Sequence, residues 1–190
     1  GSETVTGLTQ DINSGTWRYV GNGNGSADTF SIKHFAPTDY FNLTIAATDP
    51  WDEFQAGADA VVAGVLTISS GVFTAPAGTL TIGGNWVNNG TFTHNGGTVT
   101  FIGATTVQGS VATSFNNATI SGTLTGHATN LNVAGNWVNN GTFTHNSGTV
   151  TFTGTTAITG SSATNLYNTT IGIGGVLTAP GAISQATADR

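Results

Sequence analysis

A twelve-residue stretch, GNWVNNGTFTHN, occurs twice without a change, at Gly84–Asn95 and at Gly135–Asn146, 51 positions apart. The likeness extends further, because residues 84–120 and 135–171 agree at 26 of 37 positions. Self-similarity at a fixed period of a few tens of residues is typical of repeat proteins, in which stacked units bury a continuous core. The repetition therefore indicates a structural unit laid down twice, and packing alone explains it without a ligand.

Shorter periods lie inside the 51-residue unit. Apolar residues alternate with Thr or Asn in a series of short runs, which is the period of a strand with one buried face. The runs are NLTIA at 42, VLTIS at 65, TLTIG at 79, TVTFI at 98, NATIS at 117, NLNVA at 130, TVTFT at 149 and NTTIG at 168. From residue 79 onward they follow one another at steps of 19, 19, 13, 19 and 19 residues. Asn-Gly pairs, which favour tight turns, separate them.

Two all-β architectures suit short strands at even spacing: a parallel β-solenoid and an antiparallel β-sandwich. We favour the solenoid, because coils of about 20 residues would stack equivalent residues on one another. Rows of uncharged Thr and Asn are tolerated in such stacks, whereas rows of carboxylates would repel. The solenoid is predicted over residues 60–188, with 51-residue units at about 79–129 and 130–180.

The apolar positions of the unit predict its interior. Val87 and Ile120 are expected to face inward, whereas Asn88 and its neighbours are expected to turn a corner and form Asn ladders. The expected core also contains Trp86, Phe92, Val99 and Phe101, which recur as Trp137, Phe143, Val150 and Phe152.

Charge is scarce and lies at one end of the sequence. The chain holds three Lys and Arg against nine Asp and Glu, and residues 60–188 contain none of these four types. Such a chain cannot neutralise a row of phosphates, so nucleic acid is excluded as a partner. No apolar run approaches 18 residues, so no membrane span is predicted. The absence of Cys excludes disulfides and cysteine metal sites.

The stretch LTIGGNWVNNGTFTHNGGTVTF, from Leu80 to Phe101, resembles repeats of very large secreted bacterial surface proteins, the adhesin-like and haemagglutinin-like β-solenoids. The resemblance covers roughly residues 40–183. It implies a β-solenoid that acts as a stalk, fibre or adhesive array outside the cell, with no catalytic motif to carry over. An extracellular or cell-surface location, with a leader not present in this chain, is the matching expectation.

Residues 1–59 differ in composition, since they hold nearly all the charge and many aromatic residues. We interpret them as an atypical N-terminal cap or coupling segment, as expected for terminal repeats. Within them, SETVTGLT at residues 2–9 is β-prone and could donate a strand to a neighbouring copy. The self-assembly residues would be Thr4, Val5, Thr6 and Leu8.

Sites for chemistry are weak in this sequence. Asp49, Asp52, Glu53 and Asp59 could supply oxygen ligands to Ca²⁺, although their spacing fits no calcium loop. His94 and His145 are equivalent by repeat, but no carboxylate accompanies them in the sequence. No paired carboxylates for glycoside hydrolysis lie in the repeats, and no Asp lies near His94, His127 or His145.

The sequence therefore predicts a non-enzymatic protein without a cofactor that assembles head to tail with copies of itself into a filament or surface fibre. Two alternatives stay open. One is the stalk fragment of a bacterial adhesin. The other is a module whose Thr-rich face binds ice or a surface glycan, although Asn117/Thr119 and Asn130/Asn132 are expected to break the Thr-x-Thr lattice.

Overall fold

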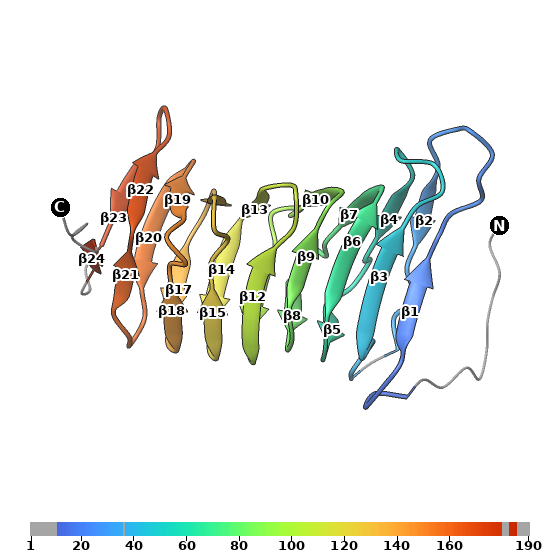
Figure 1. Ribbon diagram of the computed structural model, residues 1–190, viewed down its shortest axis with the longest axis horizontal. Helices are drawn as coiled ribbons and strands as arrows, with labels where there is room; N and C mark the ends of the chain where they lie inside the picture. The colour runs from blue at the N-terminus through green and yellow to red at the C-terminus, as the bar shows by residue number, and fades with distance from the viewer. Residues whose placement is uncertain (1–10, 36, 180–182, 186–190) are drawn as a thin grey trace.

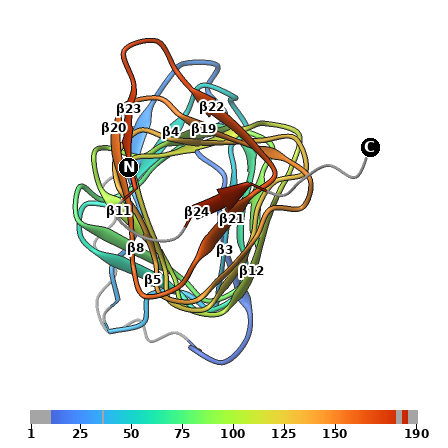
Figure 2. The ribbon, with the colours of Figure 1, turned by 90° about the vertical axis from the view of Figure 1, so that its left-hand side faces the viewer.

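A computed structural model describes residues 11–35, 37–179 and 183–185, and within these ranges the chain is a parallel β-solenoid without a helix. The coils stack into a rod, with β1 at one end and β24 at the other (Figure 1). Viewed along the rod, the coils superimpose around a common interior (Figure 2). The strand pairings given for these residues are parallel, so the solenoid is confirmed and the antiparallel sandwich is excluded.

From β3 to β23 each coil has three strands, which lie on three sides of the rod, whereas the first coil has β1 and β2 and touches side 3 only through the bridge between Tyr40 and Val62. Side 1 contains a seven-stranded sheet and then β21 and β24, which form a two-stranded sheet. Its strands are β1 (Thr16–Tyr19), β3 (Asn42–Ala46), β6 (Leu66–Ser70), β9 (Trp86–Asn88), β12 (Ala104–Gln108), β15 (Thr123–Thr125), β18 (Thr142–Thr144), β21 (Thr164–Leu166) and β24 (Ile183–Gln185).

The chain passes from side 1 to side 2 and then to side 3 before it returns to side 1. Side 2 is formed by β2 (Thr29–Ser31), β4 (Glu53–Gln55), β7 (Val72–Thr74), β10 (Thr91–Thr93), β13 (Thr113–Phe115), β16 (Asn130–Val133), β19 (Thr149–Phe152) and β22 (Asn168–Ile171). Side 3, one seven-stranded sheet, is formed by β5 (Ala60–Val62), β8 (Thr79–Ile82), β11 (Thr98–Phe101), β14 (Asn117–Ile120), β17 (Trp137–Asn139), β20 (Thr155–Thr159) and β23 (Val176–Thr178).

The length of a coil follows from the strand register. Thr98 pairs with Thr79 on one edge of β11 and with Asn117 on the other, so each coil there takes 19 residues. The 19-residue step that the alternating runs predict is therefore the coil of this part of the solenoid.

The 51-residue repeat is not a whole number of coils. Residues 79–129 hold the eight strands β8 to β15, and eight strands at three per coil make two and two-thirds coils. Each strand of the second copy consequently lies one side away from its equivalent. Trp86 is on side 1 beside Leu66, whereas Trp137 is on side 3 beside Ala118. Residues one coil apart are stacked as expected, as Thr81, Thr100 and Thr119 are, but the two copies of the 51-residue unit do not stack on one another.

The interior is apolar and is filled from all three sides. Trp86, Val99, Phe101, Trp137, Phe143, Val150 and Phe152 are buried, and Phe92 is partly buried against them. Side chains alternate along β9, so Trp86 faces inward, Val87 faces outward and Asn88 is buried. The predicted inward position of Val87 and corner position of Asn88 are wrong for this reason. Ile120 is buried as expected, but its equivalent Ile171 is exposed.

A buried polar group recurs in both copies of the repeat. Trp86 Nε1 and Asn88 Nδ2 both donate to Thr113 Oγ1, at 3.1 and 3.2 Å. Trp137 and Asn139 donate to Thr164 Oγ1 in the same way. The same twelve residues therefore build the same internal contacts on two different sides of the rod.

Thr113→Val is expected to lower the free energy of unfolding by about 1–3 kcal/mol, because it leaves two buried donors without an acceptor. Urea denaturation followed by circular dichroism measures the change. Thr100→Val is the matched control, since Thr100 faces outward on β11 between Val99 and Phe101. Equal losses in the two variants would contradict the role given to the Thr113 hydroxyl.

Residues from Thr16 onward already belong to the solenoid. β1 pairs with β3, and β3 pairs with β6, so the predicted boundary at residue 59 marks a change in composition and not in fold. Aromatic rings fill the interior of these first coils: Trp17, Tyr19, Phe30 and Phe35 are partly buried against Tyr40 and Phe54. The segment at residues 2–9 lies outside the described residues.

Candidate functional site

The acidic side chains of the first coils bind neighbouring segments of the rod. Asp59 Oδ1 accepts a hydrogen bond from Thr79 N at 2.8 Å, and the Glu53 carboxylate accepts one from the Thr74 hydroxyl. Asp49 Oδ2 accepts from Gly25 N at 3.0 Å. Asp52 is buried, and its Oδ1 accepts from Asp28 N at 3.0 Å. Asp49 and Asp52 thus join their turn to the loop of residues 21–28, whereas Glu53 and Asp59 each bind the following coil.

The structure does not gather these four carboxylates around one point. Within the described ranges, no group of three or more His, Asp or Glu side chains is arranged to hold a metal ion. Asp52 Oδ2 has no hydrogen-bond partner. It lies so close to Gly21 that a Cβ added to this glycine would be only 2.1 Å from it. The glycine at the start of the 21–28 loop is therefore required by this close approach.

Asn side chains at the corners act like these carboxylates. Asn42 Oδ1 accepts from Val65 N at 2.7 Å, and Asn85 Oδ1 accepts from Thr106 N at 3.0 Å. Asn89 and Asn140, equivalent by repeat, accept from Ser110 and Ser161 of the following coil. These corner Asn residues therefore bind the next coil through its backbone amides, without an ordered row of identical side chains.

The repeat-equivalent histidines are also structural. His94 Nδ1 accepts from Gly96 N at 3.0 Å, and His145 Nδ1 accepts from Ser147 N at 2.9 Å. His94 lies at the corner between sides 2 and 3, whereas His145 lies at the corner between sides 1 and 2. The two imidazoles therefore cannot share a metal ion. His145 instead stacks on Tyr167, with the ring centroids 5.1 Å apart.

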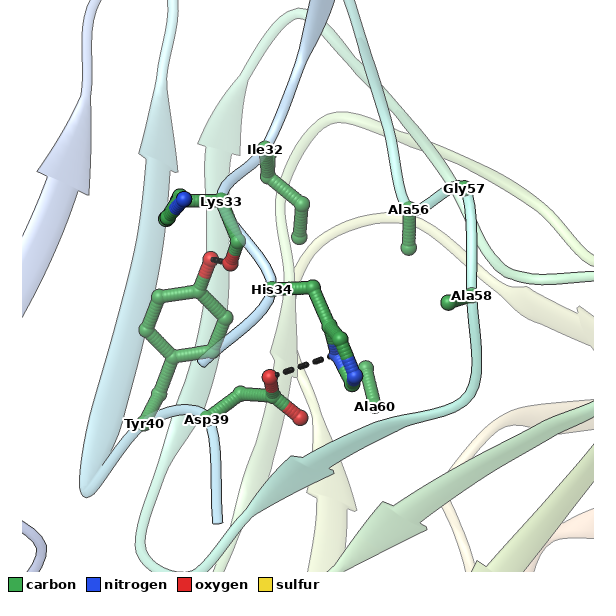
Figure 3. A pocket seen from close by; sticks show the side chains of 9 residues that line it. All are labelled: Ile32, Lys33, His34, Asp39, Tyr40, Ala56, Gly57, Ala58 and Ala60. Atoms are coloured by element: carbon green, nitrogen blue, oxygen red, sulfur yellow. Dashed lines mark hydrogen bonds and ion pairs between the residues drawn. The ribbon is translucent and has the colours of Figure 1, made fainter. Parts of the chain in front are cut away.

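A small hollow lies beside β5, where the loop of residues 33–39 crosses the first coils (Figure 3). His34 Nδ1 pairs with Asp39 Oδ1 at 2.8 Å, and the buried Asp39 also accepts from Phe35 N and Val61 N. Tyr40 donates its hydroxyl to the carbonyl of Lys33. Burial, and then the hydrogen bond with Tyr19, raise the pKa of Tyr40.

The residues that line this hollow indicate its role. The other lining residues are Ile32, Lys33, Ala56, Gly57, Ala58 and Ala60, so the Asp39–His34 pair faces no Ser, Thr or Cys nucleophile there (Figure 3). The pair fastens the loop to the first coils.

Threonine rows lie on side 3. Thr79, Thr98 and Asn117 are in register, as are Thr81, Thr100 and Thr119. Val138 follows Thr119 in the next coil and ends the polar row. Asn130 and Asn132 are on side 2, so they do not interrupt this lattice as the sequence suggested. The ice- or glycan-binding alternative stays a prediction.

The last coil presents a different surface, which we take as the candidate functional site. Ile171 is in register with buried Phe152, and therefore occupies an interior position, yet 52% of it is exposed. Leu166, on the preceding strand β21, is only 3% exposed, and β24 is paired with that strand. Ile173 and Val176 are exposed as well. Among the described residues, the solenoid interior is thus covered on side 1 of this end and open on side 2.

Strand edges at both ends of the rod are unpaired within the described residues. β22 is the last strand of its sheet on side 2, and β23 is the last strand on side 3. At the other end, β1 and β2 are the outermost strands. Free backbone N–H and C=O groups on such edges template the addition of another strand.

Fold and site together define a parallel β-solenoid repeat protein with an open terminal coil. Comparison with protein-family models, with curated proteins and with solved structures finds no match. No helix in the described ranges is long and apolar enough to cross a bilayer.

Proposed function

We propose that this protein is a non-enzymatic structural module that stacks end to end with copies of itself into an extracellular filament. The open last coil carries the proposal, because Ile171 occupies an interior position and no described strand is stacked on it. A second copy would cover this apolar surface and pair the free edges of β22 and β23.

Symmetry then favours a filament over a closed oligomer. The surface at the last coil differs from that at the first, so the contact between them is head to tail. A head-to-tail contact between the two ends of a rod does not close on itself, and it therefore produces a fibre. Residues 60–179 carry no charged side chain that would repel a stacked copy.

An extracellular location agrees with the composition. The chain has no Cys, and its three Lys and Arg residues offer few cleavage sites to trypsin-like proteases. The resemblance to secreted surface solenoids supports the same proposal.

Wild-type protein is expected to form regular filaments above a critical concentration, as seen by electron microscopy across a concentration series. Ile171→Asp should raise that concentration at least about tenfold, because it buries an unpaired charge in each joint. Ile102→Asp is the matched control, since Ile102 is also 52% exposed but lies on the flank of the rod after β11. Its critical concentration should stay close to that of the wild type.

A stalk within a longer surface protein is the second candidate. It is favoured by the repeat itself, whose second copy continues the first in one uninterrupted solenoid from β8 to β23. In that case the next coil of the same chain would cover Ile171. Isolated rods at every concentration, with no effect of Ile171→Asp on association, would support the stalk and reject the filament.

A further inference from the structure

The strand pairing of the rod is interrupted once within each copy of the repeat. On side 2, β10 ends one four-stranded sheet, and β13, the next strand on that side, begins another. On side 1, β18 ends the seven-stranded sheet and β21 begins the two-stranded sheet. β10 and β18 are equivalent by repeat, as are β13 and β21, because 51 positions separate the members of each pair. We call the break between β10 and β13 the first seam and the break between β18 and β21 the second seam.

The two strands at each seam are out of phase. β10 directs its middle residue, Phe92, inward, whereas β13 buries its first and third residues, Thr113 and Phe115. Pairing these strands middle to middle would set inward Phe92 beside outward Ser114, and a shift of one residue leaves only two residues of each strand opposite one another. β18 and β21 differ in the same way, because β18 buries its middle residue and β21 its first and third. The strand pairing therefore stops at both seams.

Side chains close the first seam where strand pairing does not. Thr113 Oγ1 accepts hydrogen bonds from Trp86 Nε1 and Asn88 Nδ2, which reach it from β9 on side 1. Across the seam itself, the ring centroids of Phe92 and Phe115 are 5.9 Å apart. Asn88 Oδ1 is buried without a hydrogen-bond partner, so the closed seam carries the cost of a desolvated polar atom. A few side-chain contacts, offset by this cost, thus replace the strand pairing found elsewhere on side 2.

The other two sides of the rod stay paired beside each seam. At the first seam, β9 pairs with β12 on side 1 and β11 pairs with β14 on side 3. At the second seam, β19 pairs with β22 on side 2 and β20 pairs with β23 on side 3. Each seam is therefore a break in one side of a rod whose other two sides are continuous, which is the geometry of a hinge.

We propose that the seams are built-in hinges, at which two neighbouring coils part on one side while the strands on the other two sides stay paired. Opening the first seam exposes Phe115 and admits water to Asn88, but it breaks no strand pairing. Free energies of local opening range from near zero to that of global unfolding, and segments with few stabilising contacts lie at the low end. Because the seams lie on different sides, the rod bends in two directions. The hinges go beyond the proposed filament and do not depend on it.

Amide hydrogen exchange of the wild-type protein, measured residue by residue by NMR, tests the first hinge. Alternate N–H groups of a parallel strand point to opposite edges. Thr91 N donates to Gly71 O beside β7, so the N–H of Phe92 points toward β13. This amide should exchange at least about tenfold faster than that of Phe73, whose strand is paired on both edges. If Phe92 is as protected as Phe73, the seam is held as firmly as paired strands and the inference is overturned.

A buried thiol distinguishes an opening hinge from a static break, and the chain has no Cys of its own to interfere. Phe115→Cys places a thiol at the first seam. Phe73→Cys is the matched control, because Phe73 is also fully buried on side 2 but lies in a strand paired on both edges. Under native conditions the Phe115→Cys thiol should react with a chromogenic aromatic disulfide at least about tenfold faster than the Phe73→Cys thiol.

The urea dependence of the two thiol reactions identifies the opening event. Low urea should hardly change the rate for Phe115→Cys, because local opening exposes little surface, whereas reaction through global unfolding rises steeply with urea. Equal rates with the same steep dependence in both variants would reject the hinge, whatever electron microscopy shows of filaments.

Discussion

Trp137→Ala is expected to lower the free energy of unfolding by about 3–5 kcal/mol. Trp137 is fully buried, and its ring packs edge to face on Phe143 with centroids 4.9 Å apart. Its Nε1 also donates to Thr164 Oγ1 at 3.3 Å. The substitution leaves a cavity and removes a buried donor, and the coils on either side cannot close the gap without losing their strand register.

Urea denaturation followed by circular dichroism measures this loss independently of the missing indole fluorescence. Trp51→Ala is the control, because Trp51 is 57% exposed and its removal should change the free energy by less than about 0.5 kcal/mol. Comparable losses for the two variants would show that Trp137 is not held in a packed interior.

Gly122→Ala is expected to cost at least about 2 kcal/mol through overpacking. Glycines recur at the corner between sides 3 and 1, at residues 103, 122 and 141 of successive coils. A Cβ on Gly122 would lie 2.4 Å from Gly103 O and 2.6 Å from Ile102 O. Both atoms are backbone, so the coils themselves would have to separate to admit a methyl group.

Gly57→Ala isolates this steric effect, because nothing lies within 4 Å of a Cβ at Gly57. Its free energy of unfolding should stay unchanged or rise by up to about 1 kcal/mol, since alanine reduces the entropy of the unfolded chain. Thermal and urea unfolding of the pair give the comparison. A Gly122→Ala variant as stable as Gly57→Ala would mean that the coils are further apart than the structure places them.

The two-and-two-thirds-coil repeat has a consequence for any longer array of these units. Three copies contain 24 strands, which make eight whole coils, so equivalent residues return to the same side only after three repeats. Corner motifs such as His94 and His145 are consequently displayed at successive corners around the rod. A fibre built this way presents each repeated surface feature in several directions.

Much of the architecture could be predicted from the alternation and the 19-residue step, because both follow from local strand geometry. The orientation of Val87 and Asn88 could also have been predicted, since an inward Trp86 requires an inward Asn88 two residues later. The prediction failed there because hydrophobicity was given more weight than the alternation. The four carboxylates suggested a shared calcium site for another reason, since they lie close together in the sequence. In the structure, each accepts a hydrogen bond from a segment 20 or more residues away.

The amino-acid pattern is enough to predict short strands with one apolar face, a packed unit that occurs twice, and uncharged coils from residue 60 onward. These properties are local, because they depend on which residue types occupy alternate positions. Three features appear only in the folded molecule: the rod has three sides, the two copies of the unit occupy different sides, and no described strand covers Ile171 at the last coil. The angle at each corner accumulates around the coil, so the side on which a strand lies depends on every turn before it and cannot be read from any one segment.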